Sequence, residues 1–136
     1  MNPILISRLN SFFLIPLLLL ATTLRSQDNT LRNIEKAIDK SYELKNYDSA
    51  IIYSEQLLTE AKKSNSNNYK IRAYFRMGLI NGQLDKTKTA IEFLYAALDL
   101  CNDTSTNHLK ASIYNELFPL IKQESGQKEG PLPNIQ

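Results

Sequence analysis

The sequence contains little of what catalysis and metal binding usually require. Its 136 residues include one cysteine, one histidine, four glycines and no tryptophan. One cysteine excludes an internal disulfide, and no residues occur at metal-ligand spacing. There is no glycine-rich phosphate loop, and no nucleophile is paired with a histidine and an orienting acid. We therefore predict a protein that is not an enzyme and that holds no cofactor and no metal.

The single cysteine and the single histidine are both predicted to be structural. Cys101 falls on the apolar stripe of a predicted helix, so we interpret it as a small core residue and not as a reactive thiol. His108 lies beside polar residues, with no second ligand or nucleophile near it in the sequence. We therefore expect its side chain to be solvated.

The chain has only one long hydrophobic run, and that run lies near its start. Residues 1–27 contain an early Arg8, an apolar stretch from Phe12 to Ala21, and then small and polar residues. This is the layout of a secretory signal peptide. Its apolar core is shorter than the roughly 20 residues needed to cross a bilayer, so an uncleaved membrane anchor is the alternative and not the first choice. We predict an exported protein, periplasmic or secreted.

The chain also carries no large charge of one sign. It has 16 Lys and Arg residues and 14 Asp and Glu residues. Arg8 and Arg25 lie in the signal segment, which contains no acid, so residues 28–136 hold 14 charges of each sign. A neutral domain has no basic surface with which to neutralise phosphates. We predict no nucleic-acid partner, and no small-molecule substrate.

What the sequence does contain is a tandem helical pattern. Residues 69–101 read as two amphipathic helices joined by the polar connection Gly82–Thr87, which allows only an antiparallel reversal. Sliding the chain against itself places similar residues 40 positions apart. The pairs include Arg32 and Arg72, Leu44 and Leu84, Ala50 and Ala90, Ile51 and Ile91, Leu58 and Leu98, Lys70 and Lys110, and Tyr74 and Tyr114. Because one helical hairpin cannot bury its own apolar face, the repeats are expected to stack.

Five helices are expected, each with an apolar stripe facing a shared core. The expected core residues are Leu31, Ile34, Ala37, Ile38 and Leu44; then Ala50, Ile51, Tyr53, Leu57, Leu58 and Ala61; then Ala73, Tyr74, Met77, Ile80 and Leu84; then Ala90, Ile91, Leu94, Ala97, Leu98 and Cys101; and last Leu109, Ile113, Tyr114, Leu117, Leu120 and Ile121. The fold class is therefore all-α, an α-solenoid of antiparallel helix hairpins with about two and a half repeats after the signal segment.

The breaks in this pattern set the expected boundaries. The polar run Ser64–Asn68 is predicted to be a long joint between repeats. Pro119 should kink or end the last helix near Phe118, because it removes a backbone donor and crowds the preceding turn. We place the repeat domain at residues 28–125. Residues 126–136, which include two prolines and no apolar stripe, are expected to be a flexible tail.

The second unit resembles a tetratricopeptide repeat. Tyr74 stands at the family's first large aromatic position, Met77–Gly78 at its Leu-Gly pair, Ala90 at its small position and Ala97–Leu98 at its Ala-Leu pair. The first unit matches less well, because Ile38 stands where glycine is expected. Gly78 and Ala90 should face each other where two helix backbones approach closely. The period of 40 exceeds the usual 34 of the family, and we attribute the excess to a longer joint between repeats.

The resemblance implies that the first helix of each hairpin lines a concave wall and meets a partner there. At such positions two basic residues of the first unit recur 40 residues later, which predicts a two-tier basic strip able to pair with peptide carboxylates. The candidate partner-binding residues are Arg32 and Lys36, their counterparts Arg72 and Arg76, and Asn115 of the third unit. The competing interpretation is that these are solvated charges balanced by acids on the same surface. Those acids are Glu35, Asp39 and Glu43.

Three functions remain open from the sequence. The first is an exported scaffold that binds a peptide or protein on its concave face. The second is the input segment of a longer signalling protein, because repeats of longer period resemble those ahead of the signalling modules of exported bacterial sensor kinases and regulators. The third is a structural module that completes its core by forming a homo-oligomer, since stacked repeats generally need three or more units.

Overall fold

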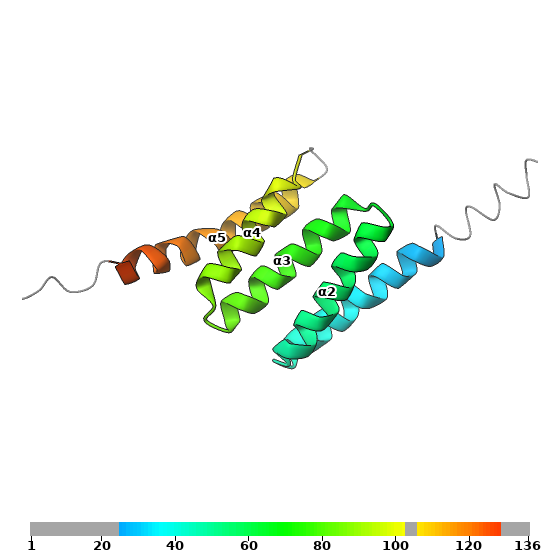
Figure 1. Ribbon diagram of the computed structural model, residues 1–136, viewed down its shortest axis with the longest axis horizontal. Helices are drawn as coiled ribbons and strands as arrows, with labels where there is room; N and C mark the ends of the chain where they lie inside the picture. The colour runs from blue at the N-terminus through cyan, green and yellow to red at the C-terminus, as the bar shows by residue number, and fades with distance from the viewer. Residues whose placement is uncertain (1–24, 103–105, 129–136) are drawn as a thin grey trace, which may run out of the picture.

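All regular structure in the described part of the chain is helical. The computed structural model describes residues 25–102 and 106–128 (Figure 1). The helices are residues 25–43, α2 (Tyr47–Lys63), α3 (Asn67–Gln83), α4 (Thr87–Asp99) and α5 (Asn107–Lys128). The expected all-α helical repeat is therefore confirmed.

The predicted signal segment lies almost wholly outside the described residues. Only residues 25–27 of that segment are described, and they form the start of the first helix. Within residues 25–102 and 106–128, no helix combines the length and the apolar character of a membrane span. The boundaries predicted at residues 27 and 125 stay predictions.

Three successive turns share one backbone conformation. The residues in the left-handed region are Lys45, Asn65 and Asp85, with φ of 56°, 50° and 57°. In each turn the residue after the left-handed one donates its N–H to the carbonyl five residues earlier, at 2.8 to 2.9 Å. The left-handed residue donates its own N–H to the carbonyl three residues earlier, at 2.9 to 3.2 Å. This pair of bonds is the Schellman motif, which reverses the chain within three residues.

The first joint between repeats is shorter than the sequence predicted. Helix α3 already begins at Asn67, so only Ser64–Ser66 separate it from α2 and not the whole run to Asn68. The Schellman motif explains the difference, since it needs no further residues to reverse the chain. Asn68 takes a place in the first turn of α3, where its Oδ1 accepts a hydrogen bond from Arg72 Nε at 2.8 Å.

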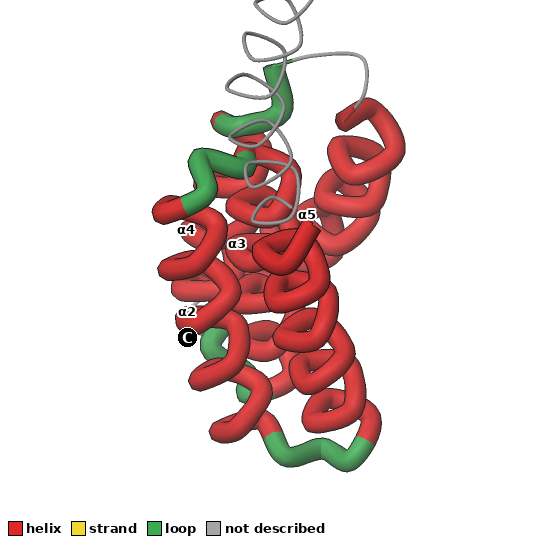
Figure 2. The backbone as a smooth tube through the Cα atoms, turned by 90° about the vertical axis from the view of Figure 1, so that its right-hand side faces the viewer, coloured by secondary structure: helices red, strands yellow, loops and turns green. Residues whose placement is uncertain are grey.

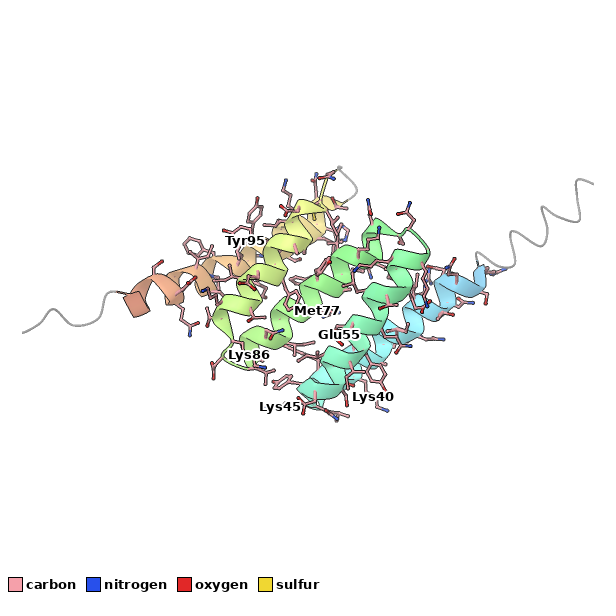
Figure 3. The ribbon with its side chains drawn as sticks, viewed as in Figure 1. Lys40, Lys45, Glu55, Met77, Lys86 and Tyr95 are labelled. Carbon is pink, nitrogen blue, oxygen red and sulfur yellow. The ribbon has the colours of Figure 1, made fainter. Side chains whose placement is uncertain are left out.

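The helices stack side by side along the long axis of the molecule (Figures 1 and 2). Lys45 and Lys86 mark two turns at the same end of the stack (Figure 3). Helix α3 contacts α2, α4 and α5, whereas α2 and α4 make almost no contact. The odd-numbered helices are therefore closer to one another than the even-numbered ones. They form the inner layer of a curved stack.

Helix α3 contributes to two separate apolar cores. Its Ala73 joins a cluster with the first helix and α2, made of Leu31, Ile34, Ile38, Leu57 and Ala61. Its Ile71 joins a cluster with α4 and α5, made of Ile91, Leu94, Ala97, Cys101, Ile113 and Leu117. The predicted role of Cys101 as a core residue is confirmed, since it is only 7% exposed. One helix thus holds both halves of the stack together.

Four residues of the expected stripes are exposed instead of buried: Leu44, Tyr53, Tyr114 and Ile121. Leu44 begins the first turn, so it lies past the helical face that packs on α2. Tyr114 and Ile121 lie on a face of α5 that no described helix covers. Conversely, Ser54, Ile71 and Asn81 are buried, although the stripes did not include them.

Helix α5 does not end near Phe118, as the sequence predicted. It continues through Pro119 to Lys128. Pro119 is exposed, so the carbonyl that loses its donor faces solvent and can be hydrated. Residues 126–128 of the predicted tail therefore belong to α5, and its remainder lies outside the described residues.

The two hairpins pack closely by opposite means. In the second hairpin a glycine on α3, Gly78, faces the large Leu94 and the backbone of Ala90 on α4. In the first hairpin the positions 40 residues earlier hold Ile38 and Ser54, both fully buried. The large residue has moved to the first helix and the small one to the second. Ile38 at the family's glycine position is therefore accommodated.

Candidate functional site

The inner face of the stack is crossed by ion pairs between the first helix and α3. Arg72 Nη1 lies 3.0 and 3.2 Å from the two carboxylate oxygens of Glu35. Arg76 Nη2 lies 2.6 Å from Asp39 Oδ1. In both pairs the arginine follows its acid by 37 residues, which defines the register of this seam. Two of the predicted partner-binding residues are thus neutralised by acids of the same protein.

Arg72 has further partners within α3. Its Nε donates to Asn68 Oδ1 at 2.8 Å, and its guanidinium carbon lies 5.8 Å from the centre of the Tyr69 ring. The planar fork that suits a carboxylate ligand is therefore already used on both edges and one face. An incoming peptide carboxylate would have to displace Glu35.

The third predicted arginine also has a partner. Arg32 Nη2 lies 3.0 Å from Asp28 Oδ2 on the same helix, and the Tyr69 hydroxyl donates to Asp28 Oδ1 at 2.9 Å. Hydrogen bonding to Tyr69 and the charge of Asp28 raise the pKa of Arg32. Burial and the hydrogen bond to Asp28 raise the pKa of Tyr69. This cluster borders a pocket of about 150 Å³ beside the turn at Ser64–Ser66.

The remaining two predicted residues lie apart from these pairs. Lys36 is exposed on the first helix, and Asn115 is exposed on α5. Neither lines a pocket on the inner face. The structure therefore brings Arg72 and Arg76 together with their acids and leaves Lys36 and Asn115 at separate places. Nothing in this geometry tests whether any of the five contacts a partner.

The seam between α3 and α5 differs from the first seam and contains a pocket. Its volume is about 110 Å³, and its lining residues are Gly78, Leu79, Gly82, Gln83, Leu94, Glu116, Pro119 and Leu120. Sequence reasoning did not identify this pocket. The only signal for it was the pair of glycines one helical turn apart, which the stripe analysis treated as a packing feature.

Side-chain size at matched positions explains why only the second seam is open. Tyr42 in the first helix occupies the position that Gly82 holds in α3. Tyr42 packs edge-to-face on Tyr47, with the ring centres 5.7 Å apart. Burial, together with the nearby Tyr47 and Glu116, raises the pKa of Tyr42. Where the first helix has this ring, α3 has no side chain, and the space remains open.

The arrangement suits binding better than proton or metal chemistry. No group of three or more His, Cys, Asp or Glu side chains that could hold a metal occurs within residues 25–102 and 106–128. His108 is exposed, and the buried Cys101 thiol donates to the Ala97 carbonyl at 3.3 Å. The inner face instead offers paired charges beside an apolar pocket with one carboxylate, which is a surface for recognising side chains.

Comparison with known proteins bears on the central hairpin. Residues 71–104 match the family model of the tetratricopeptide repeat. The match covers α4 and most of α3, the hairpin that carries the resemblance in the sequence. No curated protein and no solved structure gave a match.

Proposed function

Because residues 71–104 form a tetratricopeptide repeat, a unit typical of non-catalytic protein-interaction modules, we propose that this protein is an exported module that binds a peptide or protein segment along its inner face. Stacked helical repeats generally use the concave side of the array for this purpose. The partner would lie across the odd-numbered helices.

The observation that carries this proposal is the pocket between α3 and α5. It opens on the same face as the ion-paired seam, and a cavity of about 110 Å³ can receive a slender side chain. The ion pairs of Arg72 and Arg76 give the neighbouring surface both donors and acceptors for a peptide backbone. An extended segment crossing the inner face would meet both features.

The experiment is a selection from a random peptide library, followed by affinity measurement on two variants. Gly82→Leu places a side chain in the pocket, where a Cβ atom meets only Leu120 at 3.9 Å, so the fold should be kept. We expect at least about tenfold weaker binding, since a buried contact of the peptide is lost. Gln56→Leu adds the same side chain on the exposed surface of α2 and is the control. Unchanged binding by Gly82→Leu would contradict the proposal.

Export is a separate part of the proposal and rests on the composition of residues 1–27. An apolar core of this length after a basic residue is typical of a cleaved signal. Expression in a bacterial host, fractionation and N-terminal sequencing test it. Recovery outside the cytoplasm with a new N-terminus near residue 27 is expected. Retention in the cytoplasm with Met1 intact would contradict export, and recovery in the membrane with Met1 intact would favour the uncleaved anchor.

One structural feature favours a second candidate, a self-associating module. On α5 a stripe of three apolar residues is exposed: Tyr114 at 51%, Phe118 at 75% and Ile121 at 38%. These positions match, 40 residues later, the face of α3 that packs on α4. A second copy of the chain would cover the stripe. In a longer signalling protein, the alternative from the sequence, the next helix would cover it instead.

Sedimentation and the gene sequence separate these alternatives. If the stripe joins two copies, the purified protein sediments as a dimer and Phe118→Ser returns it to a monomer. A monomer in both forms argues against self-association. An open reading frame that continues past Gln136 into a transmitter module would support the signalling alternative.

A further inference from the structure

Glu116 stands on the inner face without the counter-ion that its position has one repeat earlier. Applying the 37-residue register of the first seam to the second places Glu116 opposite Leu79. The corresponding pair in the first seam is Arg76 with Asp39, at 2.6 Å. Both Leu79 and Glu116 line the pocket, which agrees with this register. The second seam thus keeps a charge and has lost the charge that would balance it.

The surroundings of Glu116 would suit a cation with an apolar stem. The other lining residues are apolar or lack a side chain, except for the neutral Gln83. The arginines of the inner face do not balance the carboxylate, because Arg72 and Arg76 are bonded to Glu35 and Asp39. A lysine or arginine side chain has methylene groups for the apolar wall and a charged end for the carboxylate.

We propose that the α3–α5 pocket binds a lysine or arginine side chain of the partner peptide, with its charged end paired to Glu116. This inference rests on the proposed function, because it names the chemistry of a partner bound on the inner face. It also reverses the polarity expected from the sequence, in which arginines of this face would bind acidic groups. The arginines hold the first two helices together, and the unpaired acid recognises the partner.

The test is an NMR titration of the purified protein with small probes of the side chain. The probes are Nα-acetyl-lysine methylamide, the norleucine derivative, which has the same stem without the charge, and the glutamate derivative. We expect the lysine probe to shift the amide signals of Leu79, Gly82 and Leu120, and to bind about five- to tenfold more tightly than norleucine. The glutamate probe should bind most weakly.

Two matched variants show whether Glu116 is responsible. Glu116→Gln should remove the preference for lysine over norleucine, whereas Glu92→Gln, which makes the same charge change on the exposed surface of α4, should keep it. Glu116 is exposed, so its substitution should leave the helical circular dichroism unchanged. A lysine preference that survives Glu116→Gln, or shifts that occur away from the pocket, would overturn the inference.

The library selection distinguishes failure of this inference from failure of the proposed function. Selected peptides rich in one basic position, with that preference lost in Glu116→Gln, support the inference. Peptides that bind the inner face without any basic preference overturn the inference and leave the proposed function standing. If no peptide is selected and no probe shifts the pocket signals, both fall.

Discussion

A Cβ atom on Gly78 would lie 2.7 Å from the side chain of Leu94 and 3.3 Å from the carbonyl oxygen of Ala90. Real Cβ atoms do not approach other atoms so closely, so the hairpin of α3 and α4 depends on the missing side chain. Gly82, one turn later on the same helix, has only Leu120 at 3.9 Å. The two glycines thus occupy opposite environments on one helix.

Alanine at these two positions should have effects of opposite sign. Gly78→Ala should lower the free energy of unfolding by ~1–3 kcal/mol, because overpacking outweighs the gain in helix propensity. Gly82→Ala should raise it by ~0.5–1 kcal/mol, since only the propensity changes. Urea unfolding followed by circular dichroism measures both. Equal shifts in one direction would show that the close approach at Gly78 is not needed.

Much of this fold follows from the sequence for a definable reason. Ala50, Leu57, Ala90 and Leu94 repeat at helical spacing, and all four are fully buried. What the pattern misses are positions where two helices exchange bulk, such as Ser54, because a polar residue in a stripe reads as surface. The stripe on α5 fails for another reason: periodicity marks a face as apolar but does not show whether a neighbour covers it.

The turns provide a prediction about backbone strain. Lys45 adopts φ of 56°, a conformation that costs a residue with a side chain about 1–2 kcal/mol. Lys45→Gly should therefore raise the melting temperature, with the gain reduced to under about 1 kcal/mol by the greater entropy of glycine in the unfolded chain.

Asn65→Gly is the matched control, because asparagine tolerates the left-handed region. Its gain should be smaller than that of Lys45→Gly. If both glycine variants melt below the parent, the Schellman turns are not present in solution.

The ion pair of Arg72 and Glu35 should be measurable as a coupling between two helices. The Glu35 side chain is 15% exposed and that of Arg72 is 39% exposed, so solvent screens the pair in part. A double-mutant cycle with Arg72→Ala and Glu35→Ala should give ~0.5–1 kcal/mol of coupling, falling with added salt. Coupling near zero at low salt would show that these side chains do not meet.

Alkaline pH should weaken the fold through Tyr42 and Tyr69. Their pKa values are raised in the folded protein, mainly by burial, so the unfolded chain loses these protons first. The stabilisation is complete below the ordinary tyrosine pKa of about 10 and is lost as the pH rises through the folded values. In melting curves between pH 9 and about 11.5, Tyr42→Phe should show a shallower loss than the parent. An equal loss would contradict the assignment.

The site was less predictable than the fold. The sequence placed Arg72 and Arg76 on the inner face, but their pairing depends on a register of 37 residues between non-consecutive helices, which differs from the repeat of 40. The pocket depends on what is missing at Gly82 compared with Tyr42. Periodicity compares like with like, so it does not reveal the consequences of such a difference.

The measurement that tests the central claim most directly is the NMR map of a selected peptide on the full set of backbone amides. Binding on the inner face predicts the largest shifts in α3 and α5, around Leu79, Gly82 and Glu116. Shifts centred instead on the outer surface of α2 and α4, around Ile52 and Tyr95, would contradict it.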